Sequence, residues 1–128
     1  MRLWHQKIIP HLPRQQLLGQ HRECAALRGK GWGRKHSVVN YVFTHDPSYL
    51  VAYHYKVMDE MERRGYHPDK IWRDPLWRGN RLGQCDGWAQ MIEVNGLIYK
   101  EHNDEYLKEC LENLRGKGIE IEITPIGN

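Results

Sequence analysis

The chain lacks a long apolar run, has few cysteines, and carries almost no acidic residues near its N-terminus. No stretch approaches the ~20 apolar residues that a membrane-spanning helix needs, and the basic N-terminus lacks the hydrophobic segment of a signal peptide. Cys24, Cys85 and Cys110 are odd in number and far apart, which argues against a disulfide framework or a Cys-x-x-Cys zinc pair. We therefore expect a cytoplasmic protein without a membrane partner.

The acidic residues are distributed unevenly along the chain. Residues 1 to 36 hold eight Lys or Arg and one acid, Glu23, whereas residues 37 to 128 hold eleven basic and fifteen acidic groups. The formal net charge of +3 therefore conceals a basic end with a net charge of +7. Because arginine and lysine bind phosphate oxygens and release counterions from nucleic acids, this end indicates a polyanionic partner.

The length of 128 residues, with 40% hydrophobic and 27% charged residues, is typical of one globular domain. We expect a mostly α-helical domain over residues 1–128, with about three main helices and irregular loops. The first helix is predicted over residues 13 to 27, opened by Pro13. The second follows Asp46, an N-cap, and runs to residue 64 before Gly65, and the third covers residues 103 to 114.

The regions between and after these helices are less regular. Residues 66 to 90 are rich in Gly, Pro, Trp, Arg and Asp and predict irregular surface structure. The alternating Ile-Glu-Ile-Glu-Ile at 119 to 123 predicts a short C-terminal strand, paired with residues near 92 to 98. Most of the five tryptophans are expected in the core, with Trp32 alone exposed.

Glu23 is the candidate for chemistry within the basic end. Gly19 and Ala26, four residues before and three after it, lie on the same helix face and leave room beside the carboxylate. Polar neighbours lie on the same or the adjoining face: Gln15, Gln16 and Arg22. The alternative is that Glu23 only forms a surface ion pair, which is worth about 0 to 1 kcal/mol.

A glycine-rich segment, Gly-Lys-Gly-Trp-Gly-Arg-Lys-His, follows the first helix. Arg34, Lys35 and His36 at its end suit phosphate binding, although a solvated basic face without a partner would show the same pattern. His21 and Cys24 have the helical spacing of metal ligands, but no third ligand is suitably spaced, and a packed histidine explains the pattern better. We expect no metal site.

Four motifs occur in a fixed order: L-P-R-Q-Q-L-L-G-Q-H-R-E at 12 to 23, R-K-H at 34 to 36, R-R-G-Y at 63 to 66 and W-R-G-N at 77 to 80. Together they resemble the pyrimidine-dimer DNA glycosylases with AP-lyase activity, of the phage endonuclease V type. Their order and approximate spacing agree over about residues 1 to 115. The resemblance implies a compact, mostly helical domain, in agreement with the helices predicted above.

The resemblance also implies a mechanism in which the free α-amino group attacks the sugar C1′, forms an imine and breaks the strand by β-elimination. Such an amine has a pKa of about 7.7 to 8.0 and is partly neutral near pH 7. Arg2 is too large for ordinary methionine excision, so the nucleophile would be Met1. No metal or organic cofactor would be needed.

By the same resemblance Glu23 would manage protons and stabilise the imine. DNA-binding roles would fall to Arg2, Gln15, Arg22, Arg28, Arg34, Lys35 and His36. The partner would be double-stranded DNA with a damaged base or an abasic site, bound by a monomer on the nucleoid. The family's aromatic C-terminal loop is missing here, which leaves pyrimidine dimers or another damaged base as the lesion. The alternative is a non-catalytic nucleic-acid-binding module that uses the same basic patch.

Overall fold

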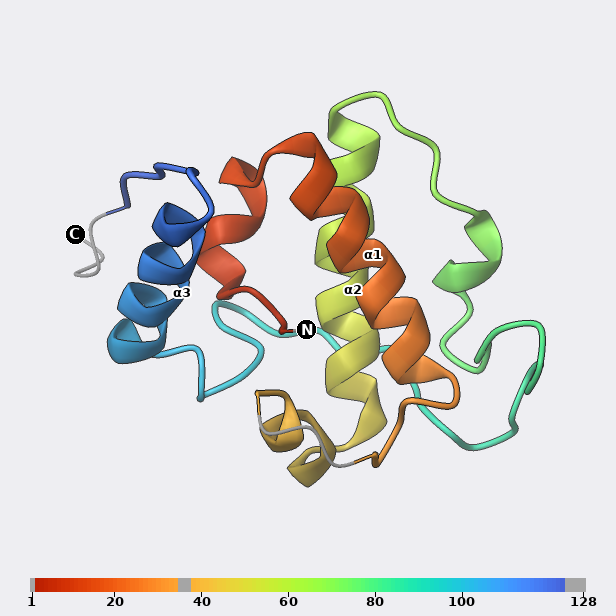
Figure 1. Ribbon diagram of the computed structural model, residues 1–128. Helices are drawn as coiled ribbons and strands as arrows, with labels where there is room; N and C mark the ends of the chain where they lie inside the picture. Colours follow the sequence, from red (N-terminus) through yellow and green to blue (C-terminus); the bar gives the residue numbers. More distant parts are fainter. Residues whose placement is uncertain (1, 35–37, 124–128) are drawn as a thin grey trace.

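The computed structural model describes residues 2–34 and 38–123 and is built around three α-helices. These are α1 (Arg14–Arg28), α2 (Pro47–Arg63) and α3 (Asp104–Gly116), with α1 lying across α2 and α3 set apart (Figure 1). Three 3-10 helices accompany them: η1 (Gln6–His11) precedes α1, η2 (Asn40–Thr44) lies between α1 and α2, and η3 (Lys70–Arg73) lies between α2 and α3. Within the described residues there is no sheet, only an isolated bridge between Trp77 and Gln84. The predicted mostly α-helical fold is confirmed.

The helix ends follow the capping residues of the sequence. Asp46 precedes α2, and its side chain accepts a hydrogen bond of 2.8 Å from the amide of Ser48, while Gly65 past its end has a φ of 89°. Asn103 caps α3 by accepting a 2.9 Å bond from the amide of Tyr106. Caps of this kind stabilise a helix by ~1 kcal/mol each because they satisfy amides that the first turn leaves unpaired.

The core forms where α1 and α2 pack and where the N-terminal segment and α3 cover their ends. Buried apolar side chains come from all of these elements and from the segment before α3, among them Leu3, Ile8, Leu17, Leu27, Leu50, Tyr53, Val57, Tyr99, Leu107 and Leu114. The N-terminal segment thus lies inside the fold rather than along its surface. None of the helices in the described part of the chain is long and apolar enough to cross a bilayer.

Two predictions about irregular regions were wrong. Residues 119 to 123 do not form a strand, and Ile119, Ile121 and Ile123 pack on the core as a single segment. The expected partner is already engaged, because the side chain of Gln6 bonds to Gly96 O at 3.0 Å and to Ile98 N at 2.8 Å. Residues 124 to 128 lie outside the described part of the chain.

Trp32 is half-buried rather than exposed. Its ring meets the rings of Phe43 and Trp88 edge-on, with centroids 5.0 and 5.6 Å apart. Such edge-to-face contacts are favourable for aromatic rings, so this tryptophan fastens the glycine-rich segment to its neighbours.

Candidate active site

A cleft of about 570 Å³ lies between α1, the N-terminal segment and the C-terminal end of α3. Its charged and amide-bearing walls include Arg2, Gln15, Arg22, Glu23, Asn113 and Lys117. Among the described residues that line it, Glu23 is the one acid. The cleft therefore combines a single carboxylate with three cations.

Glu23 occupies the inner wall of this cleft. Its residue is half-buried, and the carboxylate oxygen Oε1 is shielded from solvent. Gly19, one turn earlier, also lines the cleft, and a Cβ at that position would lie 3.7 Å from the guanidinium of Arg22. The cleft therefore opens over Gly19 and Glu23 with Arg22 at its border, whereas Ala26 does not line it.

Gln20, one turn before Glu23, holds the backbone of the N-terminal segment. Its Oε1 accepts a 2.7 Å hydrogen bond from the amide of Trp4, and its Nε2 donates a 3.0 Å bond to the carbonyl of Arg2. The hydroxyl of Tyr53 on α2 lies 2.6 Å from Trp4 O and 2.9 Å from Gln20 Oε1. Gln20 is 2% exposed, and because these bonds are buried they fix the segment against α1.

Arg2 lies between the N-terminal segment and α3. Its Nη1 is 2.8 Å from Glu109 Oε2, and its guanidinium stacks over Trp4 and Tyr106 at 5.6 and 5.8 Å from the ring centroids. Burial alone would lower the pKa of Arg2, but its hydrogen bonds to Glu109 and Cys110 outweigh that effect and the pKa is raised. The group is therefore a fixed cation at the edge of the cleft.

Sequence reasoning missed Asn113 on α3 and Lys117 directly after its end, which both line the cleft. They are four residues apart and exposed, so a helix pattern could have paired them on one face. Nothing in their spacing indicates that this face meets α1, which is ninety residues earlier in the sequence. Only the packing of α3 brings these two side chains to Glu23.

Arg28 was predicted to contact DNA, but it is fully buried. Its guanidinium donates hydrogen bonds to the carbonyls of Trp72, Asp74 and Trp77 at 2.8, 2.7 and 2.9 Å. Burial lowers the pKa of Arg28 to about 10, so it still carries its charge at neutral pH. We correct its role to a structural one, because these carbonyls occupy the donors that a phosphate would need.

The remaining predicted DNA-binding residues occupy different places. Gln15 and Arg22 are exposed on the cleft wall, whereas Arg34 is exposed in the glycine-rich segment beyond α1. Lys35 and His36 lie outside the described residues, as does the proposed nucleophile Met1.

His21 is a packed histidine, as predicted. Its Nδ1 lies 2.8 Å from Nε2 of His54, and His54 Nδ1 accepts a 3.1 Å bond from Arg28. His54 therefore carries its proton on Nε2 and donates it to His21. Burial lowers the pKa of both histidines. In the described part of the chain no group of three His, Cys, Asp or Glu side chains could hold a metal.

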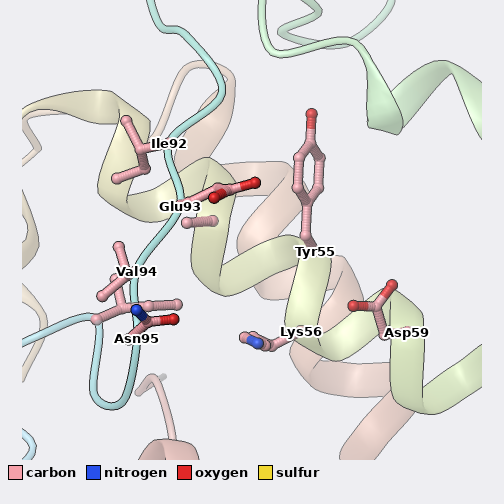
Figure 2. A pocket seen from close by; sticks show the side chains of 9 residues that line it. Tyr55, Lys56, Asp59, Ile92, Glu93, Val94 and Asn95 are labelled. Carbon is pink, nitrogen blue, oxygen red and sulfur yellow. The ribbon is translucent and has the colours of Figure 1, made fainter.

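A second hollow of about 270 Å³ lies between α2 and residues 92 to 98. Figure 2 shows Tyr55, Lys56 and Asp59 on α2 facing the segment that carries Glu93. Asp59 is engaged by Arg73 at 2.9 Å. None of the residues predicted for chemistry or DNA binding lines this hollow, so we assign the candidate site to the cleft at Glu23.

Comparison with known proteins shows the family of the chain. The family model described as pyrimidine dimer DNA glycosylase matches residues 1–74, which is more than half of the 128 residues. The match includes the N-terminal segment, α1 and α2, and with them Arg2 and Glu23. No curated protein and no solved structure matches the chain. The family is one of DNA repair glycosylases, whose substrate is DNA. This chain belongs to the pyrimidine dimer DNA glycosylase family.

Proposed function

We propose that the protein is a DNA glycosylase with AP-lyase activity whose nucleophile is the α-amino group of Met1. The amine attacks C1′ of the damaged nucleotide, and the N-glycosidic bond breaks with its electron pair leaving on the base. Loss of the amine protons and opening of the sugar ring give an imine. Removal of a C2′ proton then expels the 3′ phosphate by β-elimination, and water releases the protein from the imine.

One observation carries this proposal: the backbone of residues 2 to 4 is clamped by Gln20, one turn from Glu23 on α1. Because Met1 is joined to Arg2 by a single peptide bond, the clamp limits how far its amine can lie from the cleft. Holding a nucleophile near its target in this way converts an encounter into an intramolecular step.

Glu23 is the proposed acid and base of the reaction. It is the acid of the cleft wall, and its position beside the clamped segment suits proton transfer at C2′ or at the departing base. Its negative charge would also stabilise the cationic imine, because opposite charges attract strongly where water is partly excluded.

The cations of the cleft are the proposed DNA contacts. Arg2, Arg22 and Lys117 line it with Gln15, and guanidinium and ammonium groups there would bind phosphates on either side of the damaged nucleotide. Beyond the cleft, Arg34, Lys35 and His36 are proposed to extend this surface. The substrate would be double-stranded DNA with a pyrimidine dimer, another damaged base or an abasic site, from which the nucleotide is flipped by a monomer.

Borohydride trapping tests the proposal. Untagged protein is incubated with duplex DNA that contains an abasic site or an ultraviolet dimer, the imine is reduced, and the adduct is mapped by mass spectrometry. We expect the adduct on the Met1 amine, and we expect it to vanish when the N-terminus is extended by one residue.

Glu23→Gln separates chemistry from binding. We expect it to lower the trapping rate by about 10²- to 10⁴-fold while DNA affinity in a gel-shift or anisotropy assay changes little. Tight DNA binding without any adduct, from both the natural protein and the extended one, would instead favour the non-catalytic binding module.

A further inference from the structure

Residues 77 to 84 form a short loop that is fastened to the end of α1. Arg78 N bonds to Gly83 O at 2.9 Å and Cys85 N to Leu76 O at 2.9 Å, around the bridge between Trp77 and Gln84. In Figure 1 this loop projects at the edge of the molecule, beside the C-terminal end of α1. The family match ends at residue 74, so the loop lies beyond it.

Hydrogen bonds from two arginines hold this 77–84 loop against the end of α1. Arg28 donates to the carbonyls of Asp74 and Trp77 at its base. Arg78, within the loop, donates in the opposite direction: its Nε bonds to Arg28 O at 2.7 Å and its Nη2 to Gly29 O at 3.2 Å. Arg78 also lies over the ring of Trp88, 4.5 Å from its centroid. The loop and the start of the glycine-rich segment are therefore one rigid unit.

The tip that these contacts hold lies outside the hydrophobic core. None of residues 77 to 84 belongs to the hydrophobic core, and Asn80, Arg81 and Leu82 at the tip are exposed. Burying a guanidinium is unfavourable unless hydrogen bonds replace its lost hydration, and at Arg28 both terminal nitrogens, Nη1 and Nη2, are bonded. Of the four hydrogen bonds of Arg28, the one to Trp77 O holds the base of the loop, so the exposed tip projects from a buried anchor.

Exposed basic residues precede and follow Arg28, the residue that anchors the loop. Arg22 and Ala26 are exposed and one turn apart on α1, and Lys30 and Arg34 are exposed just beyond its end. Arg28, at the base of the loop, is five residues after Glu23, which is about 7.5 Å along the helix axis. One turn of duplex DNA spans about 34 Å, which is several times this axial separation.

We propose that the 77–84 loop is a second DNA-contacting element, in which Arg81 binds a backbone phosphate and Leu82 lies against the groove. Arg81 supplies the charge that phosphate needs, and an exposed leucine beside it suits apolar contact with sugars and base edges. The partner is the same duplex DNA as in the proposed function, on which this inference rests.

Salt dependence of binding to undamaged duplex DNA tests the loop. Each lost phosphate contact lowers the slope of log affinity against log salt by about 0.9. We therefore expect the natural protein to lose about 3.5-fold more affinity than Arg81→Gln between 50 and 200 mM salt. Arg81→Lys should restore the slope. Lys108→Gln, an exposed position on α3, is the matched control and should leave the slope unchanged.

The outcomes separate the loop from the catalytic proposal. If Arg81→Gln has the same salt slope as Lys108→Gln and the natural protein, the loop contact is overturned. The catalytic proposal is then tested separately by borohydride trapping at Met1. A reduced slope together with normal trapping on an abasic site at low salt supports both. Absence of salt-dependent DNA binding by the natural protein would overturn the loop contact and the DNA surface of the cleft together.

Discussion

His102 is expected to make the fold sensitive to acid. The residue is fully buried, and its Nδ1 accepts a 3.1 Å bond from the amide of Gln6. The neutral ring therefore carries its proton on Nε2, 2.8 Å from the hydroxyl of Tyr41. A proton on Nδ1 would break the first bond and place a charge against His5, whose ring is stacked 5.3 Å away.

Burial, with a smaller effect of His5, lowers the pKa of His102 from 6.5 to about 3. Because the folded pKa lies below the unfolded one, the unfolded chain binds a proton between these values that the folded chain does not. Stability therefore falls as the pH decreases from 6.5 toward 3. From pH 7.5 to pH 5.0 only the 1.5 pH units below 6.5 contribute appreciably, and at 1.36 kcal/mol per unit the loss is about 2 kcal/mol.

Urea unfolding at pH 7.5 and pH 5.0 measures this loss. His102→Gln keeps an acceptor for the Gln6 amide but does not titrate, so its free energy of unfolding should fall by about 2 kcal/mol less on acidification than that of the natural protein. His54 is present in both proteins and cancels in this comparison. His67→Gln, at an exposed position, is the control and should lose as much as the natural protein. Equal losses in His102→Gln and the natural protein would refute the reasoning.

Two other predictions concern Gln20 and Gly31. Gln20→Met removes the bonds to Trp4 N and Arg2 O. We expect borohydride trapping to become about 100-fold slower while DNA affinity stays nearly unchanged. Leu27→Ala, a buried control, should lower stability without slowing trapping at low temperature. Gly31→Ala places a Cβ 2.8 Å from Ala26 O and should cost about 1 to 3 kcal/mol of unfolding free energy. At Gly116 a Cβ meets nothing within 4 Å, so Gly116→Ala should be neutral or stabilising in the same urea assay; equal effects at the two glycines would contradict this steric argument.

The helices were predictable from the sequence because their signals are local. The predicted second helix, from after Asp46 to residue 64, compares with Pro47–Arg63, and the third, 103 to 114, compares with Asp104–Gly116. A cap or a glycine acts on amides and carbonyls within one turn, so its effect is readable without knowing the rest of the fold. The family, too, was recognisable from short motifs in order.

The predicted strand at 119 to 123 failed because a strand needs a partner. Alternating apolar residues indicate that one face of the segment is buried. This part of the prediction is confirmed, because all three isoleucines pack on the core. The tertiary structure decides whether a neighbouring backbone segment can pair with this one. Here the side chain of Gln6 is hydrogen-bonded to backbone groups of Gly96 and Ile98.

By itself the sequence determined the basic N-terminal end, its single acid Glu23 and the helix that carries it, because charge and helical periodicity are properties of neighbouring residues. The tertiary structure alone decided that Arg28 is buried while Lys117 reaches the cleft. Both are cations near a helix end, and the difference arises from what packs against them. Arg28 meets backbone carbonyls from residues 72 to 77 that need donors. Lys117 follows the end of α3, which packs beside the N-terminal segment, and its side chain is exposed to solvent.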